Sequence, residues 1–204
     1  LTNSDTIYLA AGVLQGTKIY DSIAAVTNQA IELVPFFLAR RYLASEVSIQ
    51  RLLVALIMAG LVYSIPMLIE SQVSPQVNIW IYGYFQHDFF QTLRFGGYRP
   101  VVFLQHGLWV AFFTLMALMA SVAIWRHCAP DDRPKQTVIV LYLGVMLILC
   151  KSVGPMLYAL ALVPLILLAP RRMQIACAAV LAVVVMAYPF LRGLVLKEGD
   201  FALG

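Results

Sequence analysis

Long apolar segments separated by short polar connections make up most of this chain. Five of them follow one another from residue 52 onward, at 52–69, 100–125, 137–153, 154–169 and 173–191. A helix of about 20 apolar residues crosses the bilayer core, and none of these segments alternates as the strands of a membrane barrel do. A weaker sixth segment, 22–39, contains Asn28, Gln29 and Glu32. The pattern predicts an all-α transmembrane bundle with about six spans.

The composition supports an integral membrane protein. Of the 204 residues, 62% are hydrophobic and 12% are charged, and the mean hydropathy is +0.85. Soluble domains are about half apolar and a quarter charged. The net charge of +4 does not call for a nucleic-acid partner. The first residue is Leu1 rather than methionine, so we expect residues 1–204 to form a single transmembrane domain that is part of a longer chain.

Lysine and arginine between the predicted spans indicate the orientation, because short cytoplasmic connections are enriched in them. With six spans, three basic clusters fall on one side, which we take as cytoplasmic: Arg40, Arg41 and Arg51; Arg126, Arg133 and Lys135; Arg171 and Arg172. The segment 70–99, the turn 151–155 and the end from residue 192 then lie on the outer side.

The outer segment 70–99 is polar enough to leave the membrane, yet it is rich in aromatic residues. It contains Trp80, Tyr82, Tyr84, Phe85, Phe89, Phe90, Phe95 and Tyr98. Tryptophan and tyrosine concentrate at the boundary between lipid and water, so we expect an interfacial helix here. The rings, with Trp80 and Tyr98 as candidates, can also stack on the sugar or lipid of a bound substrate.

Two cationic helix starts are predicted on the outer side. Pro100 suits the first turn of a helix, where its missing N–H needs no partner, and this places Arg99 at the cap. Pro155 begins another predicted helix shortly after Lys151. Helix starts favour anions, and an arginine fork matches phosphate oxygens. Together with Arg94, these cations are candidates for binding a pyrophosphate group.

Three titratable side chains on the same side are further candidates. His106 follows Arg99 by seven residues, about two helical turns, so the two are expected to share a helix face. A histidine there can move a proton near neutral pH. Glu70 ends the second predicted span, and His87 lies in the aromatic segment; both are candidates for binding the carrier or its sugar.

Each candidate also has a simpler structural interpretation. Arg94 and Arg99 can anchor to lipid headgroups, Lys151 can extend from a helix end to the interface, His106 can be a packing residue, His87 a surface residue and Glu70 a helix-end charge. Cys128, Cys150 and Cys177 show no metal-ligand or C-x-x-C spacing, so neither a disulfide framework nor a metal site is expected.

Two stretches resemble the bacterial O-antigen ligase and polymerase superfamily, which also contains exopolysaccharide polymerases. The stretch from Glu70 to Leu108, with "RFGGYRPVVFLQHGL", is similar to the outer loop and following helix of exopolysaccharide members. The stretch "LILCKSVGPMLYALALVPLIL" is similar to a helix–turn–helix of the family. Many ligases have Ser-Arg-Gly in that turn, where this chain has Ser152-Val153-Gly154 preceded by Lys151. The resemblance covers roughly residues 22–191.

The resemblance implies a function in surface polysaccharide biosynthesis at the bacterial inner membrane. Family members transfer a glycan from a polyprenyl-diphosphate carrier to an acceptor sugar on the outer side, inverting the anomeric carbon, with no bound metal or other cofactor. The implied roles are diphosphate binding by Arg94, Arg99 and Lys151 and catalysis by Arg99 and His106, with Glu70 or an outer loop beyond this chain as other sources of a base. Other polysaccharide assembly proteins are candidate partners.

Two other functions remain open on the sequence. A transporter or flippase of lipid-linked glycans would use the same outer cations, although transporters usually show broken helices in two related halves, and no internal repeat is present here. A membrane scaffold protein without catalytic or transport activity would not need these outer cations. If the chain is an enzyme, the resemblance of the sequence around Tyr98–His106 to exopolysaccharide members favours a polymerase over a ligase.

Overall fold

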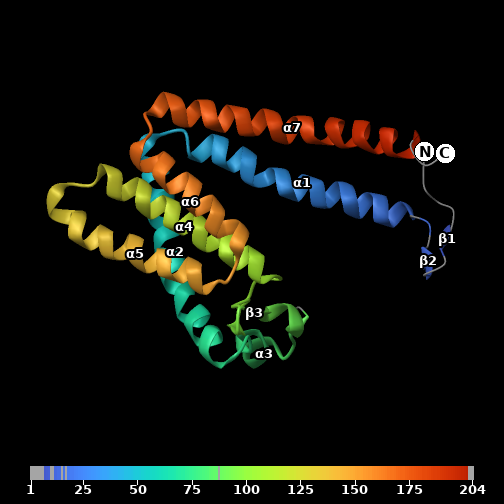
Figure 1. Cartoon of the computed structure of the whole chain (residues 1–204), viewed down its shortest axis with the longest axis horizontal. Coiled ribbons are helices and arrows are strands. Elements are labelled where there is room, and N and C mark those ends of the chain that lie inside the picture. Colours follow the sequence, from blue (N-terminus) through green and yellow to red (C-terminus); the bar gives the residue numbers. More distant parts are fainter. Residues whose placement is uncertain (1–6, 10–11, 15, 17, 87, 202–204) are drawn as a thin grey trace. The chain divides into compact units, whose positions relative to one another are not determined.

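The computed structural model describes residues 7–9, 12–14, 16, 18–86 and 88–201, and most of them are helical (Figure 1). The elements are β1 (Ile7–Leu9), β2 (Gly12–Leu14), α1 (Ile19–Tyr42), α2 (Glu46–Val73), α3 (Val77–Tyr82), the 3₁₀ turn η1 (Phe89–Thr92), β3 (Leu93–Arg94), β4 (Gly97–Tyr98), α4 (Gly107–His127), the 3₁₀ turn η2 (Pro130–Asp132), α5 (Arg133–Leu149), α6 (Val153–Leu168) and α7 (Arg171–Phe201). The chain divides into two units, residues 1–52 and 53–204, each described by itself.

Four described helices are long and apolar enough to cross a membrane. They are α1, α2, α4 and the Arg171–Tyr188 part of α7, and α6 is a shorter apolar helix. The prediction of a mostly helical chain with long, apolar helices compatible with a membrane bundle is confirmed, while the number of six spans stays a prediction.

The first unit contains a β-hairpin that the sequence pattern did not predict, followed by α1. Strands β1 and β2 pair antiparallel, with Ile7 opposite Leu14. The backbone N–H of Lys18 donates to the Asp21 carboxylate over 2.8 Å and closes the first turn of α1. The predicted segment 22–39 lies within this helix.

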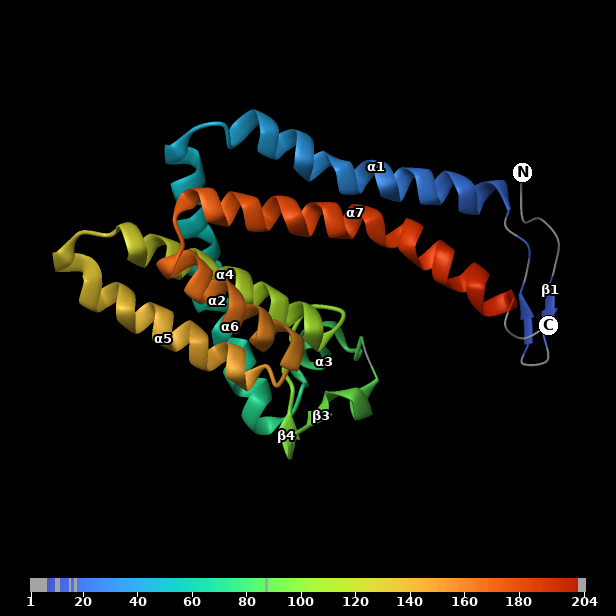
Figure 2. The same ribbon diagram turned by 45° about the horizontal axis from the view of Figure 1, so that its top comes forward.

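The second unit is centred on α4, which packs against both α5 and α6 (Figures 1 and 2). Its core consists of buried residues from α2, α4 and α5, including Met67, Val110, Leu118, Leu143 and Met146. Helix α2 crosses α4 closely, because a Cβ at Gly60 would lie 2.6 Å from the Cβ of Ala117. The hydroxyl groups of Ser64 and Tyr142 form a hydrogen bond of 2.7 Å in the same region.

Several predicted helix boundaries differ from the observed ones. Helix α2 is longer than 52–69, α5 begins and ends four residues before 137–153, and α7 continues to Phe201 instead of ending at 191. The prediction of a helix start at Pro100 is wrong, since α4 begins at Gly107. Helix α6 agrees with 154–169 to within one residue.

The expected outer segment forms a compact loop. It contains the six-residue helix α3, the turn η1 and a two-stranded hairpin of β3 and β4. Many of its rings are exposed, with Trp80 at 60%, Phe90 at 80% and Phe95 at 76%. These exposures fit the expected interfacial segment, while its place in the bilayer stays a prediction.

Candidate functional site

Glu70 anchors the loop from the end of α2. Its side chain is only 1% exposed. One carboxylate oxygen accepts the N–H of Val77 at 3.0 Å, and the other accepts those of Val101 and Val102 at 2.8 and 2.7 Å. A carboxylate with three backbone donors joins segments far apart in sequence. We therefore assign Glu70 a structural role in holding the loop, and its contact with substrate stays a prediction.

The backbone conformation of Val102 explains why residues 100–106 do not form a helix. Val102 has a left-handed backbone with φ of 53°, which a branched residue adopts at a cost. The side-chain amide of Gln86 donates to the carbonyls of Val102 and Leu104 at 2.7 and 2.9 Å. Because a right-handed helix cannot include a left-handed residue, no helix begins at Pro100.

The predicted helix geometry of Arg99 and His106 is therefore wrong. Arg99 does not cap a helix, and the two residues share no helix face. Instead, His106 is the N-cap of α4, and its Nδ1 accepts the backbone N–H of Leu108 at 2.9 Å. This is the side-chain capping that a helix start requires.

A tight hairpin carries Arg94 and leads into Arg99. Leu93 pairs with Tyr98 and Arg94 with Gly97, and the two-residue turn between them has positive φ at both Phe95 (50°) and Gly96 (70°). These values are those of a type I′ turn, whose twist matches that of the strands. The N–H of Arg99 then donates to the carbonyl of Thr92 at 2.8 Å, so the hairpin fixes the backbone of Arg99.

The side chain of Arg99 is buried and incompletely satisfied. It is 6% exposed and packs on Gly107, where a Cβ would lie 2.6 Å from Arg99 Nε. Its Nε has no hydrogen-bond partner. Burial lowers the pKa of the Arg99 guanidinium below its ordinary value, and the nearby charge of Arg94 lowers it further. An arginine nevertheless stays protonated in proteins, so a buried positive charge remains.

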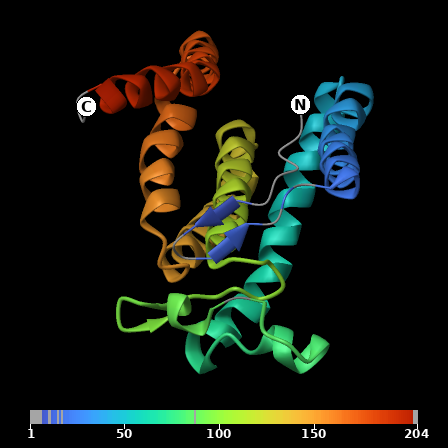
Figure 3. The same cartoon turned by 90° about the vertical axis from the view of Figure 1, so that its right-hand side faces the viewer.

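Lys151 reaches the same hairpin from the turn between α5 and α6. Its φ of 49° lies in the left-handed region, which favours glycine and costs a lysine about 1 kcal/mol. Its amino group lies against Gly97 in space that a Cβ would take. Figures 2 and 3 show the hairpin beside the α5–α6 turn. A segment more than 50 residues away in sequence thus brings its amino group to the hairpin that carries Arg94.

No carboxylate balances this cluster in the described part of the chain. Neither Arg94, Arg99 nor Lys151 forms an ion pair with a described residue. Buried charges in proteins are normally paired or hydrogen-bonded. A cluster of like charges with an open donor is suited to an anion. The described residues contain no group of three or more His, Cys, Asp or Glu placed to hold a metal ion.

The other predicted site residues differ in how they are placed relative to this cluster. Tyr98 belongs to the hairpin itself, and its ring lies 6.3 Å from that of Phe89. His106 directly precedes Gly107, on which Arg99 packs, so it stays close in the chain without the helical relation. Trp80 is exposed on α3. His87 lies outside the described residues.

Two glycines are site residues that the sequence reasoning missed. Gly97 leaves space for Lys151, and Gly107 leaves space for Arg99. The glycine pair after Phe95 was the available signal, since such pairs mark tight hairpins. Nothing in the sequence pattern indicated that the space above each glycine would be filled by a cation from another segment.

Comparisons with protein-family models, with curated proteins and with solved structures find no match for this chain.

Proposed function

We propose that this chain is part of a bacterial inner-membrane glycosyltransferase of the O-antigen ligase and exopolysaccharide polymerase type. It would move a glycan from a polyprenyl-diphosphate carrier to an acceptor sugar. The observation that carries the proposal is the buried guanidinium of Arg99, whose Nε has no hydrogen-bond partner, with the charge of Arg94 near it and the amino group of Lys151 at the same hairpin. A diphosphate carries several negative charges and supplies the missing counterion.

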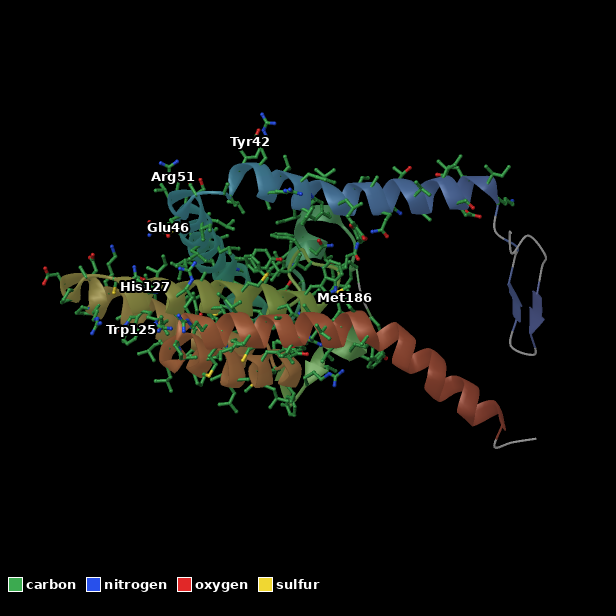
Figure 4. All side chains as sticks on the ribbon, turned by 90° about the horizontal axis from the view of Figure 1, so that it is seen from above. Tyr42, Glu46, Arg51, Trp125, His127 and Met186 are labelled. Carbon is green, nitrogen blue, oxygen red and sulfur yellow. The ribbon has the colours of Figure 1, made fainter. Side chains whose placement is uncertain are left out.

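The proposed topology has six spans, with the hairpin and the α5–α6 turn facing the periplasm. The ends of α4 and α6 and the starts of α5 and α7 would then face the cytoplasm with Arg126, Arg133, Arg171 and Arg172. Figure 4 labels Trp125 and His127 at this end of α4. The basic residues follow the cytoplasmic bias, and the three cations of the hairpin side go against it.

The proposed step is an inverting substitution. The hydroxyl oxygen of the acceptor sugar forms a bond to the anomeric carbon, while the bond from that carbon to the diphosphate oxygen breaks. The bonding electrons go to the diphosphate, where Arg94, Arg99 and Lys151 stabilise the growing charge. The hydroxyl proton goes to a base, for which His106 is the candidate in this chain. Its Nδ1, the ring nitrogen that can take a proton, accepts the N–H of Leu108, so His106 would have to release this bond to act.

Product analysis in lipid nanodiscs tests the function. We expect the protein, given a polyprenyl-diphosphate oligosaccharide and an acceptor glycan, to release polyprenyl diphosphate and lengthen the acceptor. A transporter would instead move the intact lipid-linked glycan across sealed vesicles and release no polyprenyl diphosphate. That outcome, or the absence of both products, would refute the assignment.

Labelling of Phe95→Cys tests the orientation, because Phe95 is exposed at the hairpin tip. A membrane-impermeant maleimide added to intact spheroplasts is expected to label this variant. Labelling only after the cells are opened would place the cluster in the cytoplasm and exclude the proposed reaction.

A further inference from the structure

Helix α1 carries polar side chains at membrane depth that the described fold does not cover. Asn28, Gln29 and Glu32 lie in the middle of this 24-residue candidate span. No residue of α1 is buried, and these three side chains form no hydrogen bond or ion pair with any described residue. Amide and carboxylate groups in a membrane span are costly unless they pair or face a protein interior. These groups therefore require a partner inside the bilayer.

Asn28 and Glu32 lie on the same side of α1. Successive residues of a helix are about 100° apart, so Glu32 lies one turn after Asn28 and about 40° around the helix from it. Ala25 and Ala39 belong to this side as well, and such small residues let membrane helices approach closely. The opposite side consists of apolar residues that are 47–71% exposed and suit contact with lipid: Ile23, Val26, Leu33 and Phe37.

A second copy of α1 supplies the groups that this side needs. An amide donates hydrogen bonds and a carboxylate accepts them, so Asn28 of one copy suits Glu32 of another. Copies of one protein have the same orientation in the membrane, so their α1 helices run parallel. Around a two-fold axis a residue offset to one side meets the residue offset to the other side on its partner, which places Glu32 opposite the partner's Asn28. Helical side chains lean toward the N-terminus, and this brings the carboxylate back to the level of that amide.

The other described spans offer no comparable donor at this depth. Their side-chain amides lie near helix ends, at Gln50, Gln72 and Gln174. The amide of Gln174 already donates to carbonyls at the end of α6. The serine and threonine hydroxyls in the middle of α2 and α4 donate to carbonyls of their own helices. The amides that match Glu32 thus lie on α1 itself, which favours a second copy of this chain as the partner.

We propose that α1 pairs in parallel with α1 of a second copy through mutual hydrogen bonds between Asn28 and Glu32. The pairing makes the protein a symmetric dimer in the membrane, and it is independent of the proposed glycosyl transfer. Each dimer contains two such bonds, one on either side of the two-fold axis, so that the amides hold the two carboxylates apart.

Leucine substitutions at neighbouring positions provide the variants for a test. Asn28→Leu and Glu32→Leu each remove one side of the proposed bond, and Thr27→Leu is the matched control. Thr27 lies about 100° around the helix from Asn28, and its hydroxyl donates to the carbonyl of Ile23 in its own helix over 2.8 Å. All three changes make α1 more apolar, so each variant should insert into the membrane at least as well as wild type. Loss of pairing therefore cannot come from failed insertion.

The test is Förster energy transfer between donor-tagged and acceptor-tagged copies of the full chain in phosphatidylcholine vesicles, measured over a range of protein-to-lipid ratios. We expect wild type to associate, with a transfer efficiency that rises linearly with the fraction of acceptor-tagged copies, as it does for a dimer. Asn28→Leu and Glu32→Leu should each weaken the association roughly tenfold, because every dimer loses two polar bonds. Thr27→Leu should leave the association unchanged.

Three outcomes would overturn the inference: a monomeric wild type at every ratio, unchanged association of Asn28→Leu and Glu32→Leu, or equal weakening by Thr27→Leu. Thermal unfolding of the same variants then identifies the partner of α1. If Glu32→Leu lowers the melting temperature without changing the association, the partner is another span of the same chain, and the dimer is excluded.

Discussion

Both ends of the α4–α6 bundle carry arginines, but the arginines differ in their interaction partners. At the end with the α4–α5 connection, Arg126 donates to the carbonyls of Ile166 and Ala169. The guanidinium of Arg133 lies over the ring of Trp125, 5.5 Å from its centroid. At the hairpin end, Arg99 is buried with an open Nε, and Arg94 and Lys151 lie nearby.

The difference shows how a cation with a structural role can be distinguished from one that is available to bind a ligand. Arg126 satisfies the carbonyls that the end of α6 leaves without helical partners, so its charge is used inside the protein. Arg99 meets no acceptor for its Nε, and like charges beside it increase the cost of burial. Residue type is the same at both ends, so the partners decide the role.

The largest expected effect is that of Arg99→Gln. Because the amide cannot carry the charge that stabilises a leaving diphosphate, transfer should fall about 1,000-fold. The melting temperature in nanodiscs should not fall, since a buried like charge is removed. Initial rates of polyprenyl diphosphate release measure the first effect. Wild-type glycan lengths from this variant would contradict the assignment.

Glu70→Ala should cause the largest loss of stability. It leaves the buried N–H groups of Val77, Val101 and Val102 without their acceptor, which we expect to cost about 3 kcal/mol or more in the free energy of unfolding. Glu70→Gln keeps an acceptor oxygen and should lose less. Denaturant unfolding and limited proteolysis of residues 74–106 would measure both. If Glu70→Ala were as stable as wild type, Glu70 would not have the anchoring role assigned to it.

Arg126→Gln is the structural counterpart of Arg99→Gln, with the reverse outcome. Loss of its bonds to two carbonyls should lower the free energy of unfolding by about 1–2 kcal/mol. Affinity for inorganic diphosphate, measured by calorimetry, should not change. A weakened diphosphate affinity would mean that the two ends of the bundle are not as distinct as described.

The smallest expected effect is that of Gly97→Ala. The new methyl group would take the space of the Lys151 amino group, and since the end of a lysine moves easily, stability should hardly change. Diphosphate affinity should fall by about threefold as the amine is displaced, a typical loss for one partly exposed charge contact. Gly154→Ala, with open space around it, is the control. Equal affinities for both variants would argue against a role for Lys151.

Part of the fold could be predicted because it follows from local composition. Runs of apolar residues without charges have no stable place in water, so the helices around 52–69, 154–169 and 173–191 could be recognised from the sequence, with errors at their ends. The cations at positions 94, 99 and 151 could also be named, because lysine and arginine are uncommon on the predicted outer side.

The prediction failed where distant residues supply the hydrogen bonds. Local preferences at Pro100 suggest a helix start, but Val102 is left-handed, and its N–H and carbonyl are bonded to the distant side chains of Glu70 and Gln86. Helix propensity is a weak local preference that tertiary contacts override. For the same reason His106 became a helix cap instead of a neighbour of Arg99 on one helix face.

The sequence by itself determined that the chain forms long apolar helices able to cross a membrane, with cations near a loop rich in aromatic residues. Only the tertiary structure decided which cations meet and which lack partners. A charge's partners are set by space and by hydrogen bonds between segments far apart in the chain. Gly97 and Gly107 are the clearest case, because each matters only through the side chain that another segment places above it.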